Sequence, residues 1–94
     1  MARLLRQTRQ FKTDKKRIQR SGRHDWEKMR AVVKALMNDR PLDERLRDHP
    51  LTGDYAGVRE CQVEPDWLLI YSTAGDVNTG VLTLIRTGSH SGLF

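Results

Sequence analysis

The feature that most constrains the fold is a run of five apolar residues, 67–71, with the sequence WLLIY. A strand that is apolar on both faces has to be covered on both faces, so this run predicts the central strand of a sheet, Asp66–Ser72. Strands are also predicted at Gly57–Gln62 and Val81–Thr87, on either side of it. The turn-forming residues of 73–80 predict a hairpin loop between the second and third of these strands.

The first half of the chain has a helical rather than a strand pattern. Phe11 and Ile18 lie seven residues apart among basic residues, which predicts a surface helix over 11–20. Apolar residues at steps of three and four predict a second helix from Asp25 to Asn38. The connection at 21–24 favours a two-helix hairpin, and the short segment 2–8 is a candidate first strand.

These elements predict a single α+β domain over residues 1–94, in the order β-α-α-β-β-β. The two-helix hairpin is expected to pack on one face of a mainly antiparallel sheet. A helical turn at Leu42–Leu46 and a turn at Thr52–Asp54 are expected between the helices and the sheet. Alternation along the last strand predicts two opposite faces, one carrying Val81, Thr83 and Ile85, the other carrying Leu82, Leu84 and Arg86.

The charge of the chain is divided unevenly between its halves. Residues 1–47 hold fifteen Lys and Arg against six Asp and Glu, whereas residues 48–94 hold two against six. Twelve of the seventeen basic residues are Arg, whose planar guanidinium pairs with phosphate through two hydrogen bonds. This pattern indicates a face that binds a polyanion, with a solvated helix surface as the alternative.

Composition excludes several classes of protein and of site. The one cysteine, Cys61, permits no internal disulfide or cysteine-based zinc site; it favours a reducing, cytoplasmic setting and is itself expected to be an inert buried thiol. No apolar run approaches the roughly 20 residues of a membrane span. The N-terminal segment lacks the apolar region of a secretory signal. No metal-ligand spacing or phosphate-binding glycine loop is present.

Three residues could meet at one end of the sheet, and His49 is a further candidate. His49 and His90 lie just outside predicted elements, where scaffolds display working groups. Antiparallel pairing is expected to bring Asp66, at the start of the central strand, beside Arg86, at the end of the last strand, with His90 just past them. Such groups can cleave RNA without a metal, by taking a proton from the 2′-OH, protonating the 5′-oxygen and stabilising the phosphorane. The alternative is a structural ion pair with a frayed tail. His24 is expected to be a surface or capping residue.

Three segments resemble YafQ-type toxins of the RelE/ParE superfamily: His49–Gly53, Gly57–Tyr71 and Arg86–Phe94. The pattern HPL, VEPDW-LIY and RTG-H…LF, in this order and spacing, is specific, although each part alone would be weak. The resemblance covers about half of the chain closely. It implies a small RelE-like endoribonuclease, independent of metals and cofactors, which enters the ribosomal A site and cuts mRNA as the toxic half of a bacterial type II toxin–antitoxin pair.

The resemblance also assigns site residues. His49 and His90 become the candidates for proton transfer. Asp66 becomes the orienting or proton-accepting carboxylate and Arg86 the group that holds the phosphate. Phe94 would shape the site near the substrate. These five are the expected catalytic positions.

Two further positions are expected near the substrate. Gln62 stands where the family is expected to carry a second histidine, and an amide can hydrogen-bond a phosphate or a base but cannot transfer protons near neutral pH. The chain therefore relies on His49 and His90, has weakened activity, or carries a change engineered to reduce toxicity. Trp67 is expected to anchor the core behind Asp66, with base stacking as the alternative.

The implied partners are the ribosome, mRNA and an acidic, partly disordered antitoxin, with no membrane. Ribosomal RNA is expected to contact the basic helix through Lys12, Lys15, Lys16 and Arg17. The antitoxin would cover either the helices or the mouth of the active site. Two alternatives remain: a non-nucleolytic toxin of the ParE type that poisons gyrase, and a basic RNA-binding module without chemistry.

Overall fold

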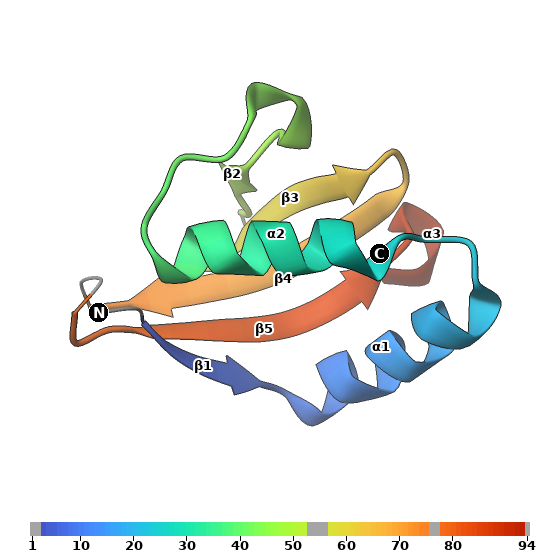
Figure 1. Cartoon of the computed structure of the whole chain (residues 1–94), viewed down its shortest axis with the longest axis horizontal. Helices are drawn as coiled ribbons and strands as arrows, with labels where there is room; N and C mark the ends of the chain where they lie inside the picture. Colours follow the sequence, from blue (N-terminus) through green and yellow to red (C-terminus); the bar gives the residue numbers. More distant parts are fainter. Residues whose placement is uncertain (1–2, 53–56, 76–77, 94) are drawn as a thin grey trace.

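The computed structural model describes residues 3–52, 57–75 and 78–93, and Figure 1 shows its arrangement. The elements follow the predicted order, with a two-residue strand β2 and a short helix α3 in addition. Part of the expected turn at 52–54 and part of the loop at 73–80 lie outside the described residues. The elements are β1 (Leu4–Gln7), α1 (Arg9–Ser21), α2 (Trp26–Met37), the 3₁₀ helix η1 (Glu44–Leu46), β2 (His49–Pro50), β3 (Arg59–Glu64), β4 (Trp67–Ala74), β5 (Val81–Gly88) and α3 (His90–Leu93).

The five strands form one mixed sheet in the order β1-β5-β4-β3-β2. Only the β1–β5 pair is parallel among these described strands, so the sheet is mainly antiparallel as expected. β4 lies at the centre, and its residues 67–71 are all buried. The prediction from the WLLIY run is therefore confirmed.

Both long helices start at side-chain caps. The Thr8 side chain accepts a hydrogen bond from the backbone N–H of Phe11 at 3.0 Å, and α1 ends at Gly22 with a left-handed φ of 66°. Asp25 caps α2 by accepting from the backbone N–H of Glu27 at 3.0 Å. These caps place both helices within two residues of their predicted ends.

The core lies between the helices and one face of the sheet. α1 packs mainly on β5 and α2 on β3 (Figure 1). The two helices contact each other through Phe11 and Trp26, whose ring centroids lie 6.4 Å apart. Cys61 lies in this core, which confirms that it is buried, and burial raises the pKa of its thiol to about 12. No helix in the described ranges is long and apolar enough to cross a membrane.

A β-bulge changes the faces of β5. Tyr71 pairs with Leu84, whereas its neighbour Ile70 pairs with Arg86, so Ile85 is the extra residue. Arg86 therefore lies on the opposite face from Leu84. The prediction that these two residues share a face is wrong, because one inserted residue reverses the alternation beyond it.

Candidate active site

Asp66 and His90 meet where β4 begins and α3 follows β5. Asp66 occupies the tight turn between β3 and β4 with a φ of 59°, a left-handed conformation that Asp tolerates better than most residues. Its Oδ1 accepts from the His90 backbone N–H at 3.1 Å and lies 3.2 Å from the His90 ring Nδ1. The turn and the start of α3 together fix this pair.

The electrostatics of the pair define its chemistry. The His90 backbone N–H, followed by the His90 ring, holds the pKa of the Asp66 carboxyl below its ordinary value. An ionised carboxylate only accepts hydrogen bonds, so Nδ1 of His90 carries the proton of this contact. Nε2 is then the ring atom that can exchange a proton with a substrate. Both side chains are more than half exposed, so they are accessible from solvent.

Arg86 lies farther along the sheet than predicted. The strand register places His90 next to Asp66, but Arg86 opposite Ile70, four residues along β4, or roughly 13 Å of extended strand. The Nε and one terminal nitrogen of Arg86 instead donate to the two oxygens of Asp14 in α1, at 3.0 and 3.1 Å. The prediction that Asp66 and Arg86 are direct neighbours is wrong, because the histidine occupies that place.

His49 lies in the edge strand β2, which sequence patterns do not reveal because it has two residues. The backbone carbonyl of Arg47 lies 2.6 Å from Nδ1 of His49. A carbonyl only accepts, so Nδ1 is the protonated nitrogen and Nε2 carries the lone pair. Asp48 holds this segment against the sheet by accepting from the Tyr71 hydroxyl and from Arg59 Nε. Because β3 lies between β2 and β4, the backbone of His49 is not adjacent to the start of β4, where Asp66 and His90 meet.

The remaining predicted site residues occupy different environments. Gln62 is half-buried in β3. Trp67 is completely buried, and its Nε1 donates to Thr87 Oγ1 at 2.9 Å, which confirms the core anchor and leaves no surface on which a base could stack. His24 stacks on Trp67 with 4.6 Å between ring centroids, so it packs on the core behind the site. Phe94 lies outside the described residues.

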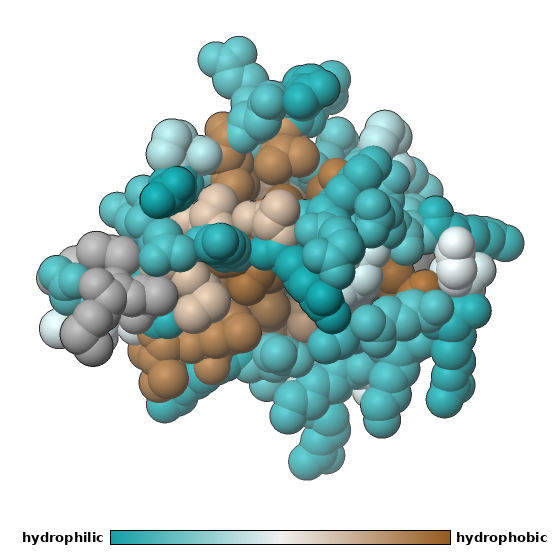
Figure 2. Space-filling model, viewed as in Figure 1, coloured by the Kyte–Doolittle hydropathy of each residue, from teal (hydrophilic) through white to brown (hydrophobic). Residues whose placement is uncertain are grey.

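The basic residues of α1 form an outward surface. Lys12 and Lys16 are exposed, and Figure 2 shows a hydrophilic surface over this helix. Lys15 lies over the Trp26 ring at 5.4 Å, and Arg17 is 66% exposed although it pairs with an aspartate of the same helix. All four predicted contacts with RNA thus belong to one helix, with three of them facing solvent.

Sequence reasoning missed Asp14, which is only 2% exposed. It is the only acidic residue among positions 1–23, and it lies three residues after Phe11 and four before Ile18, on the apolar stripe of α1. An isolated acid on an apolar stripe is a signal of a buried, paired carboxylate. The described ranges contain no group of His, Cys, Asp and Glu residues that could hold a metal.

Comparison of the sequence with known proteins identifies a family. A family model described as a bacterial toxin of the type II toxin–antitoxin system, YafQ, matches residues 3–94. The chain is 37% identical over 86 residues to the mRNA interferase toxin YafQ of Escherichia coli K12, a match that covers 90% of this chain and 88% of the relative.

Solved structures agree with this match. The Escherichia coli DinJ–YafQ toxin–antitoxin complex contains a chain with a TM-score of 0.87 and 35% identity, over 100% of this chain and 99% of that one. A metal-bound toxin from Helicobacter pylori has a TM-score of 0.84 and 37% identity, with both chains covered completely. The chain described here therefore belongs to the YafQ family of bacterial type II toxin–antitoxin toxins.

Proposed function

We propose that this chain is a toxin that cleaves mRNA in the ribosomal A site, by attack of the ribose 2′-OH and without a metal ion. The Asp66–His90 contact carries the proposal, because it is a solvent-accessible proton-transfer pair at the end of a rigid sheet. The mRNA interferase activity named for the Escherichia coli relative supports it.

His90 is the proposed general acid. Asp66 holds Nδ1, so the ring presents Nε2 to the leaving group. When the ring carries both protons, Nε2 donates one to the 5′-oxygen as the phosphorus–oxygen bond breaks. Asp66 remains ionised and orients the ring, a role suited to a carboxyl group whose pKa is lowered.

His49 is the proposed general base. Its Nδ1 is bonded to the Arg47 carbonyl, so Nε2 can take the proton of the 2′-OH. The resulting 2′-oxygen attacks phosphorus and forms a 2′,3′-cyclic phosphate. Gln62 and Arg86 supply N–H donors to the phosphate oxygens, where negative charge develops. The RNA would run from His49 in β2 across β3 to the start of β4, where Asp66 and His90 lie.

The same observations weigh against the two alternatives. A gyrase poison or a plain RNA-binding module acts by contact alone. Neither needs an exposed histidine whose Nδ1 is held by a carboxylate within 3.2 Å. Cleavage of RNA, in contrast, needs a histidine held in this way to transfer a proton.

The test adds purified protein to ribosomes translating a reporter mRNA and maps the new RNA ends. The expected products end within the A-site codon, with a 2′,3′-cyclic phosphate on one side and a 5′-hydroxyl on the other. The same mRNA without ribosomes serves as the control and should stay intact. Translation that stops while the mRNA remains uncut would refute cleavage, and a gyrase supercoiling assay would then test the ParE-like alternative.

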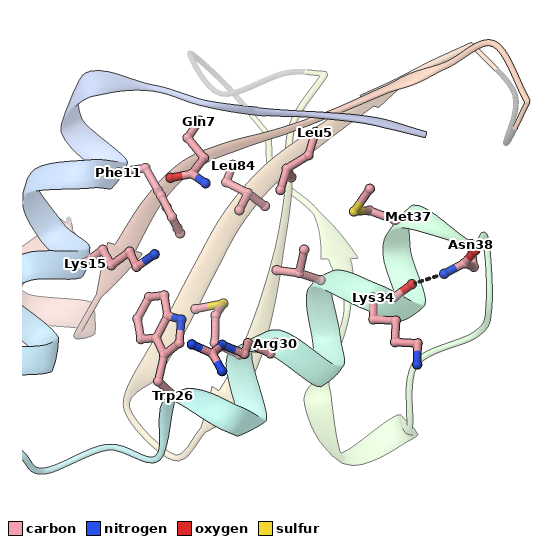
Figure 3. Close-up of a pocket in the computed structure, with 12 residues that line it drawn as sticks. Leu5, Gln7, Phe11, Lys15, Trp26, Arg30, Lys34, Met37, Asn38 and Leu84 are labelled. Atoms are coloured by element: carbon pink, nitrogen blue, oxygen red, sulfur yellow. Dashed lines mark hydrogen bonds between the residues drawn. The ribbon is translucent and has the colours of Figure 1, made fainter. Parts of the chain in front are cut away.

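The antitoxin is proposed to dock in a groove between β1, α1 and α2 rather than at the active-site mouth. The groove has a volume of about 410 Å³. Figure 3 shows apolar side chains converging in it, and Figure 2 shows hydrophobic surface between α2 and β1. Lys15, Arg30 and Lys34 border the groove, so an amphipathic segment with acidic flanks fits both its floor and its rim. The residues of the floor include Leu5, Phe11, Trp26, Val33, Met37 and Leu84.

Charge reversal of the rim tests this docking site. The Arg30→Glu/Lys34→Glu variant should lose affinity for the cognate antitoxin, mainly through slower association, while it retains cleavage. The matched control is Arg40→Glu/Arg45→Glu, which reverses two arginines outside the groove and should bind like the wild type. Equal antitoxin affinity in both variants would move the docking site away from the groove.

A further inference from the structure

We propose that Asp14 is a positioning residue for cleavage, which holds the Arg86 guanidinium in the orientation that meets the scissile phosphate. This inference rests on the proposed nuclease function. It concerns a residue of α1, a helix whose other charged residues, apart from Lys15, are exposed. It gives that helix a role in the chemistry as well as in binding.

The Asp14 carboxylate has four hydrogen-bond donors around it. Oδ2 accepts from Arg86 Nε at 3.0 Å and from the Thr87 backbone N–H at 3.2 Å. Oδ1 accepts from a terminal nitrogen of Arg86 at 3.1 Å and from one of Arg17 at 2.9 Å. A buried carboxylate with this many donors is fully satisfied and therefore rigid.

The two contacts with Arg86 fix a direction. Nε and one terminal nitrogen form one edge of the planar guanidinium, and Asp14 occupies that edge. The orientation of the plane is then set, and with it the direction of the opposite edge. The Arg86 side chain is 30% exposed, so it remains accessible while the carboxylate is buried.

Local topology explains why α1 supplies this carboxylate. β1 pairs with β5 only as far as Gln7 opposite Leu84. Beyond that point α1 lies against β5, and Asp14 accepts from the Thr87 backbone N–H as a neighbouring strand would. The bulge at Ile85 turns Arg86 to the face opposite Leu84, while its side chain still reaches the carboxylate. The alternative is that Asp14 only stabilises the edge of the sheet, and the experiment must distinguish this role from the positioning of Arg86.

The experiment is a double-mutant cycle with Asp14→Asn and Arg86→Ala, measured as single-turnover cleavage of ribosome-bound mRNA at saturating protein. Asp14→Asn should lower the maximal rate about 10- to 100-fold without changing ribosome affinity, since a displaced catalytic group costs roughly this much. In the Arg86→Ala background the same substitution should have no further effect. A wild-type rate for Asp14→Asn, or effects that multiply independently, would overturn the proposal.

A control variant, a second substitution at Asp14 and an NMR measurement separate effects on stability from effects on function. Val32→Ala, a buried change in α2, serves as a control that lowers stability and should cleave at the wild-type rate once folded. If Asp14→Asn does not fold, Asp14→Glu keeps the charge, displaces it by one methylene and should show the same dependence on Arg86. The ¹⁵Nε–H NMR signal of Arg86 should move and lose exchange protection in the Asp14 variant but not in Val32→Ala. An unchanged signal refutes the positioning role, whereas absent cleavage by the wild type refutes only the nuclease function.

Discussion

The strand-end site and the outer face of α1 use charge in different ways. At the strand end, one carboxylate and one histidine contact each other at 3.1 and 3.2 Å. On α1, charges of one sign are spread over a helix surface, and Lys12 and Lys16 are exposed. Proton transfer needs groups held at a defined distance, whereas attraction to a polyanion needs only a field of one sign.

The difference teaches that rate and affinity should be separable in this molecule. Substitutions at the strand end should slow cleavage without weakening ribosome binding. Substitutions on α1 should weaken binding and reduce its salt dependence without altering the chemistry. Asp14 and Arg17 are the exceptions, because Asp14 contacts Arg86 and Arg17 donates to Asp14.

The largest expected effect comes from His90→Ala. Loss of the general acid should slow single-turnover cleavage by about 10²- to 10⁴-fold. Ribosome affinity, measured by pelleting or fluorescence, should equal that of the wild type because the arginine- and lysine-rich face is intact. The assignment is falsified if this variant cleaves at the wild-type rate.

Neutralising the α1 face should have the next largest effect. Replacing Lys12, Lys15, Lys16 and Arg17 with Gln should weaken ribosome binding by about 10- to 100-fold at low salt and flatten its salt dependence. Saturating protein should restore the cleavage rate of a variant that changes the three lysines and leaves Arg17, a donor to Asp14, intact. The control replaces Arg40, Arg45 and Arg47, which lie outside α1, with Gln. Identical salt titrations for the wild type and the α1 variant would show that this face is an ordinary solvated surface that does not bind ribosomal RNA.

His49→Ala should cost less than His90→Ala, about tenfold in the single-turnover rate. Solvent can still accept the 2′-OH proton, and Gln62 and Arg86 still hold the phosphate. The comparison uses the same mRNA and ribosomes for both variants. A larger loss for His49→Ala than for His90→Ala would reverse the relative importance of the two ends of the site.

The smallest effect concerns pH. The His90 contacts hold the pKa of Asp66 below its ordinary value of 3.8, so the ionised carboxylate is the form that the folded protein favours. Its contribution to stability is present above the unfolded-state pKa and is lost as pH falls through the folded-state pKa. The His90 amide signal in NMR should therefore titrate with a midpoint below 3.8, and the titration should vanish in Asp66→Asn. A midpoint at or above that value would contradict the contact.

Sequence predicted the elements whose signals are local. The period of α2 and the WLLIY run of β4 each carry their own evidence, and both predictions were confirmed. β2 has two residues and is defined by its pairing with β3, so no local sequence pattern predicts it. The bulge at Ile85 is a property of two strands together, which explains why the face of Arg86 was predicted wrongly.

In the candidate site, too, the contact that follows from strand pairing was predicted, whereas contacts between distant elements were not. His90 was expected beside Asp66 because antiparallel register brings the end of one strand to the start of the next, and the structure confirms that contact. The Arg86–Asp14 pair joins residues that are 72 positions apart, in a helix and a strand whose packing the sequence does not specify. His24 was expected to be a surface or capping residue. Its side chain is 27% exposed and also packs on Trp67, because the loop between the helices lies close to the start of β4.

The most direct test of the account replaces the 5′-oxygen of the scissile bond with sulfur in ribosome-bound mRNA. A thiolate leaves without being protonated, so the step assigned to His90 is no longer needed. Cleavage of this substrate by His90→Ala should come within about tenfold of the wild-type rate, whereas His49→Ala should keep its full loss. An equal loss for His90→Ala on the oxygen and sulfur substrates would contradict its role as the general acid.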